Sequence, residues 1–123
     1  MAHDTIEIYV RDCSENEVVE WLREVFEDVE PQEDALVRTY EGRYEGRTVP
    51  VQIAMHVENG PYTSLWFNAP EMPWDEATAC ARDAQAALEK EVLCFLNDPE
   101  RPWTMLRVSD AGEEHVDKRE VSL

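Results

Sequence analysis

The side chains that most often carry out chemistry in proteins are few in this sequence and widely separated. The histidines are His3, His56 and His115, and none has a second ligand at the spacing of a zinc or metalloprotease motif. The glycines form neither a phosphate-binding loop nor a dinucleotide fingerprint. No serine lies in a nucleophile elbow. We therefore expect no metal and no cofactor, and the sequence favours a protein that is not an enzyme.

The cysteines indicate a reducing compartment. Cys13, Cys80 and Cys94 are odd in number and form no C-x-x-C pair, which is typical of free thiols. No apolar run approaches the ~20 residues that a membrane helix needs. The first residues alternate and include acids, unlike a signal peptide. We expect a cytoplasmic protein that does not bind membranes.

Charge is the strongest signal in the composition. Asp and Glu number 28 against 11 Lys and Arg, and the formal net charge is −17. Residues 1–34 alone hold twelve acids and only two bases. This balance argues against direct binding to nucleic acid or to an anionic membrane, because both need clustered Lys and Arg. A basic protein is the partner that such a field attracts.

The densest acids accompany a predicted helix. Ser14 and Glu17 form a capping box, and apolar residues recur at helical spacing from residue 18 to residue 29, before Pro31 ends the helix and residues 31–34 form a loop. The polar side of this helix is the predicted partner-binding surface, and it carries Glu17, Glu20, Glu24, Glu27 and Asp28. We expect a binding or inhibitor protein that neutralises a basic partner, as immunity-type proteins do for nuclease toxins or as DNA mimics do.

A second candidate site lies on the strands that follow. Alternating segments predict strands at 35–40, 48–57 and 62–67, joined as an antiparallel meander. Polar and aromatic side chains are expected on its open face: Tyr40, Arg43, Gln52, His56, Tyr62 and Trp66. A small ligand-binding or enzymatic domain that uses this face is the alternative function. A further alternative is that the acidity serves only solubility or salt adaptation.

The segment YEGRYEGR at residues 40–47 repeats one four-residue unit. We interpret it as a hairpin, with one glycine in the turn and the other in a bulge of the returning strand, because glycine tolerates positive φ. The alternative is an exposed surface of arginine and tyrosine, both of which are common at binding hot spots.

The remaining segments complete one domain over residues 1–123. Strands are predicted at 5–10, 91–96 and 103–109, and an alanine-rich helix at 76–90 with Asp75 as its N-cap. Residues 113–121 form an edge strand or a frayed tail. The predicted fold is α+β, with a twisted, mainly antiparallel sheet in the order β-α-β-β-β-α-β-β(-β). Both helices are expected on one face of the sheet.

Overall fold

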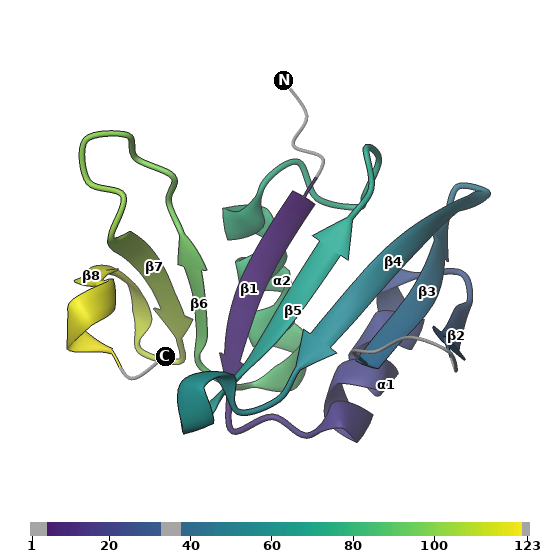
Figure 1. Cartoon of the computed structure of the whole chain (residues 1–123), viewed down its shortest axis with the longest axis horizontal. Coiled ribbons are helices and arrows are strands. Elements are labelled where there is room, and N and C mark those ends of the chain that lie inside the picture. Colours follow the sequence, from purple (N-terminus) through teal and green to yellow (C-terminus); the bar gives the residue numbers. More distant parts are fainter. Residues whose placement is uncertain (1–4, 33–37, 122–123) are drawn as a thin grey trace.

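The computed structural model describes residues 5–32 and 38–121. It contains one eight-stranded antiparallel sheet with two helices on one of its faces (Figure 1). The strands lie in the order β2-β3-β4-β5-β1-β6-β7-β8. The predicted α+β class and the placement of both helices are confirmed. The elements are β1 (Thr5–Arg11), α1 (Glu15–Val25), β2 (Val29–Gln32), β3 (Arg38–Tyr44), β4 (Arg47–Ala54), η1 (Val57–Asn59), β5 (Tyr62–Asn68), α2 (Ala77–Leu88), β6 (Val92–Phe95), β7 (Thr104–Ser109), β8 (Gly112–Asp117) and η2 (Lys118–Glu120).

Helix α1 begins as predicted but ends earlier. The capping box of Ser14 and Glu17 is present, and the helix stops at Val25. Val29, which was expected on the helix, starts the short strand β2 and pairs with Gly42 of β3. Pro31 is therefore part of an edge strand rather than a loop, a position that tolerates its missing N–H. The burial of Val29 against β3 outweighs the helical pattern that the local sequence also fits.

The tandem repeat forms the β3–β4 hairpin. Tyr44 pairs with Arg47, and the two residues between them, Glu45 and Gly46, have φ values of +50° and +78°. Positive φ at both positions is the mark of a type I′ turn. The predicted turn glycine is confirmed, but the predicted bulge is wrong. Gly42 pairs regularly with Val49, and it lacks a side chain because the ring of Phe26 lies directly over it.

The main core lies between the sheet and the helices. Four aromatic rings gather there: Trp21 stacks on Trp74 at 5.7 Å, and Phe67 meets Trp74 edge-on at 5.1 Å beside Phe26. Small side chains on α2 are fully buried, which allows the helix to lie close to the sheet. The N-cap of α2 is Glu76, not Asp75 as predicted, and its side chain makes no capping bond.

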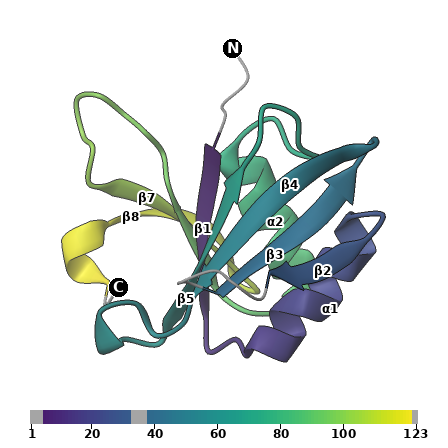
Figure 2. The same cartoon turned by 45° about the vertical axis from the view of Figure 1, so that its right-hand side comes forward.

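A second apolar cluster covers part of the opposite face. It consists of Tyr9, Tyr62, Leu93, Met105 and Val116. Strands β7 and β8 turn steeply away from β3 and β4 at this end of the sheet (Figure 2). Helices α1 and α2 lie on the far side in Figure 1, so within the described residues neither of these two helices covers β3, β4 and β5 on the near face. Neither of the helices in the described residues has the length and hydropathy to cross a membrane.

Candidate functional site

The carboxylate of Glu7 is fixed in place on the uncovered face. Alternation along β1 buries Ile6 and Ile8 under the helices and turns Glu7 to the other side. There Ser64 donates a hydrogen bond of 2.7 Å and Tyr9 one of 3.0 Å, one to each carboxylate oxygen. A carboxylate oxygen has two lone pairs. Glu7 is therefore oriented by two hydroxyl groups and keeps acceptor capacity for a ligand.

Trp66 stands directly beside this carboxylate. The register of β1 and β5 places Glu7 opposite Trp66, and the register of β4 and β5 places Gln52 opposite Trp66. Trp66 is half-buried, as is Gln52. A carboxylate, an amide and an indole thus lie in one row across three neighbouring strands. Such a row offers both an anionic and an aromatic contact to a ligand.

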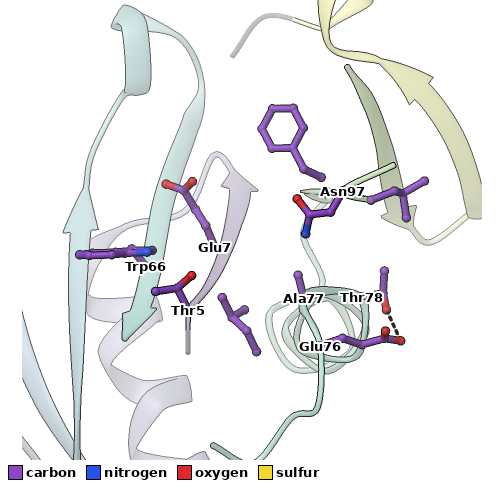
Figure 3. Close-up of a pocket in the computed structure, with 10 residues that line it drawn as sticks. Thr5, Glu7, Trp66, Glu76, Ala77, Thr78 and Asn97 are labelled. Carbon is purple, nitrogen blue, oxygen red and sulfur yellow. Dashed lines mark hydrogen bonds between the residues drawn. The ribbon is translucent and has the colours of Figure 1, made fainter. Parts of the chain in front are cut away.

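A cleft opens next to Glu7 because β1 and β6 separate. The two strands pair at Tyr9 with Leu93 and at Val10 with Val92, next to a backbone hydrogen bond from Arg11 to Glu91. Beyond these pairs the strands diverge and leave a cleft of about 400 Å³, lined by β1, β5, β6 and the start of α2. Figure 3 shows Glu7 and Trp66 on one side of this cleft and Asn97 on the other.

The aromatic rings of Tyr9 and Phe95 meet where the two strands come together. Their centroids are 6.1 Å apart in an edge-on arrangement. At the other end the cleft is lined by Ala77, which begins α2, and by the N-cap residue Glu76, whose carboxylate turns to Thr78 and accepts a 2.8 Å hydrogen bond from it (Figure 3). The cleft therefore has an aromatic end, and a second acidic residue lines its far end.

A smaller hollow of about 300 Å³ adjoins the cleft on the other side of Trp66, over Gln52, Ala54 and Ser64. Among residues 5–32 and 38–121, no lysine or arginine lines either hollow, and the charged lining residues are Glu7 and Glu76. The electrostatic character of the site is thus negative. It matches a cation better than a phosphate or a carboxylate.

The structure brings together only part of the predicted sheet-face site. Gln52 and Trp66 share the uncovered face as expected. Tyr62 lies on the same face, but it is buried in the second apolar cluster and donates a hydrogen bond to Glu91. Burial, followed by that bond, raises the pKa of Tyr62 to about 12.

The other three predicted residues lie apart from this row. Tyr40 points to the helix side of the sheet, where it donates a 2.5 Å hydrogen bond to Glu15. His56 lies beyond the end of β4, with its Nδ1 3.3 Å from the Gly60 carbonyl oxygen. Arg43 does lie on the uncovered face, because Thr39 pairs with Gln52 and side chains four residues apart on a strand point the same way, but it is exposed near the turn of the β3–β4 hairpin, away from the row. Tyr40 and His56 are the two residues that the structure removes from the expected face, since Tyr40 faces the helices and β4 ends before His56.

The predicted partner-binding acids do not form one helix face. Glu20 and Glu24 are exposed on α1. Glu17 serves the capping box and lies 3.8 Å from Lys90. Glu27 lies after the helix, where it accepts a 2.6 Å hydrogen bond from the backbone N–H of the hairpin turn. Asp28 also follows the helix end and is exposed. These last two acids belong to the hairpin side of the molecule, contrary to their predicted place on the helix.

Sequence reasoning missed Glu7, Tyr9 and Ser64. The alternation of TIEIYV places Glu7 and Tyr9 on the polar face of their strand, and that of YTSLWF places Ser64 between Tyr62 and Trp66. These two signals were available locally. What the pattern did not contain was that the two strands are neighbours.

No protein-family model matches the chain, and neither a curated protein nor a solved structure matches it. Within residues 5–32 and 38–121, no group of three or more His, Cys, Asp or Glu side chains is arranged to hold a metal ion.

Proposed function

We propose that this protein is a non-enzymatic binding protein that takes a basic protein partner on the uncovered face of its sheet. The observation that carries this proposal is the Glu7 carboxylate, held by Ser64 and Tyr9 beside Trp66 in a site where none of the described lining residues is basic. A group that is already oriented loses little freedom on binding. Tryptophan is among the residues that contribute most at protein interfaces.

The rest of the acidic surface supports the same proposal through its field. With a net charge of −17, the molecule attracts cationic partners from a distance and speeds their encounter. The ion pairs of the described residues engage a minority of the acids. Glu20 and Glu24 of α1 belong to the acids outside those pairs. We assign the long-range attraction of the basic partner to the acids of α1, and the direct contact with that partner to the uncovered face of the sheet.

Capture followed by kinetics tests this division. The immobilised protein is used to capture basic proteins from the cell that expresses it, and a captured protein is then purified for binding measurements. Glu7→Lys and Glu20→Lys change the net charge equally and so control for each other. We expect Glu7→Lys to raise the dissociation rate, and Glu20→Lys to lower only the association rate in low salt. Equal dissociation rates for the two variants would refute a contact at Glu7, and would favour a role of the acids in solubility alone.

A further inference from the structure

The cleft between β1 and β6 has the properties of a receptor for one chemical group. Resting on the proposed function, we infer that this cleft binds a guanidinium group and takes an arginine side chain of the basic partner. Four features of the cleft lead to this assignment: its acceptors, the direction of its backbone groups, its apolar walls and its charge.

The side chains that line the cleft are rich in hydrogen-bond acceptors. Glu7 contributes a carboxylate whose two oxygens are oriented by Ser64 and Tyr9, and Asn97 faces it from the opposite wall (Figure 3). A guanidinium carries five N–H donors and no acceptor, in a planar fork that matches a carboxylate. An ammonium is a compact and more strongly hydrated charge, so it gains less from a partly buried site.

Backbone groups of β1 also point into the cleft. The N–H of Arg11 donates to the Glu91 carbonyl at 2.9 Å across the β1–β6 side. Backbone groups two residues apart on a strand point the same way, so those of Tyr9 and Glu7 point to this side as well. The paired register ends at Tyr9 and Leu93. Both backbone groups of Glu7 thus turn toward the cleft, where the carbonyl is a further acceptor and the N–H a donor.

The walls suit the methylene stem of an arginine. Trp66, Phe95 and Leu96 are each half-buried and line the cleft. Arginine places its stem along apolar surface and its head near carboxylates or aromatic rings. A volume of about 400 Å³ is at the small end of ligand sites, large enough for one side chain.

The charge at the far end of the cleft also favours a cation. The N-terminus of α2 carries a partial positive charge of about one half. Glu76, the N-cap residue, makes no capping bond; it lines the cleft as a second acidic side chain, with its carboxylate turned to Thr78 (Figure 3). Together with Glu7, it leaves the cleft negative despite the helix dipole.

Binding of small blocked amino acids tests the assignment without the partner. The probes are the N-acetyl, N-methylamide derivatives of arginine, lysine and citrulline, and the readout is the NMR shift of the Trp66 indole N–H. We expect the arginine probe to shift this signal at millimolar concentration and the isosteric, neutral citrulline probe to leave it in place. Glu7→Gln should weaken arginine binding about tenfold or more, because a charge-assisted hydrogen bond is lost. Glu30→Gln, an equal change of charge on the edge strand β2, should leave it unchanged.

Several outcomes would overturn the assignment: no shift with the arginine probe, equal affinity for the lysine or citrulline probe, or equal weakening by Glu7→Gln and Glu30→Gln. These results are separable from a failure of the proposed function. If the probe fails while a basic partner still binds with Glu7-dependent kinetics, only the arginine assignment falls. If the probe binds and the cell provides no basic partner, the protein-binding function falls and the guanidinium site stands.

Discussion

Replacing Gly42 by alanine should destabilise the protein through a single contact. A Cβ at Gly42 would lie 2.7 Å from Cγ and 2.9 Å from Cδ2 of Phe26, which is closer than carbon atoms approach one another. The Phe26 ring is buried among Phe67 and Trp74, with centroid distances of 6.4 Å and 6.0 Å, so it is not free to move aside. The cost should match that of overpacking a well-filled core, about 1–3 kcal/mol.

Thermal and urea unfolding measure this cost. In a domain of this size each kcal/mol corresponds to about 4 °C in Tm. Gly46→Ala is the matched control, because Gly46 has a φ of +78° and no atom within 4 Å of an added Cβ. Its cost of roughly 1–2 kcal/mol should come from backbone strain alone.

A double-mutant cycle separates the two mechanisms. In a Phe26→Leu background, Gly42→Ala should cost markedly less than in the wild type, while the cost of Gly46→Ala should stay the same. A neutral Gly42→Ala variant, or additive effects with Phe26→Leu, would refute the contact between Gly42 and Phe26 as the reason for this glycine.

Three further predictions concern thiols, alkaline pH and the hairpin arginines. Cys13, Cys80 and Cys94 are buried, and burial raises the pKa of each thiol. All three should therefore react with a thiol reagent far more slowly in the native protein than in urea, and rapid labelling of the native protein would contradict this prediction. The pKa of Tyr62 is raised from about 10 to about 12 in the folded protein, so its contribution to stability is fully present below pH ~10 and is lost as the pH rises toward 12. Urea unfolding followed by tyrosinate absorbance should show this loss, and Tyr62→Phe should reduce it. Arg43→Ala and Arg47→Ala should each change the free energy of unfolding by less than about 0.5 kcal/mol, because both side chains are exposed. A loss of partner binding in either variant would instead favour a recognition role for the hairpin.

The parts of the fold that depend on local pattern were predictable. The alternation of TIEIYV predicted β1, and Ser14 with Glu17 predicted the start of α1. The turn at Gly46 followed from the need for positive φ. Each of these features is decided by residues within a few positions of one another, so a single sequence contains the information.

The rest depends on contacts between distant segments. Val29 fits the helical spacing, but its pairing with Gly42 placed it in a strand, and that pairing is not visible locally. The site shows the same limit, because the hydrogen bond between Glu7 and Ser64 joins positions 57 residues apart. Alternation told which residues share a face of one strand. Alternation does not show which strands are neighbours. The position of β1 between β5 and β6 creates both the carboxylate site and the cleft.

The most direct test of the proposed function is an NMR map of the partner-binding surface. A captured basic protein is titrated into the labelled protein, and backbone and indole shifts are followed. The proposal predicts that the largest shifts fall on the uncovered sheet face, around Glu7, Gln52 and Trp66. Shifts confined to α1 around Glu20 and Glu24, with the sheet face unchanged, would contradict a contact at Glu7 and would move the binding surface to the helix.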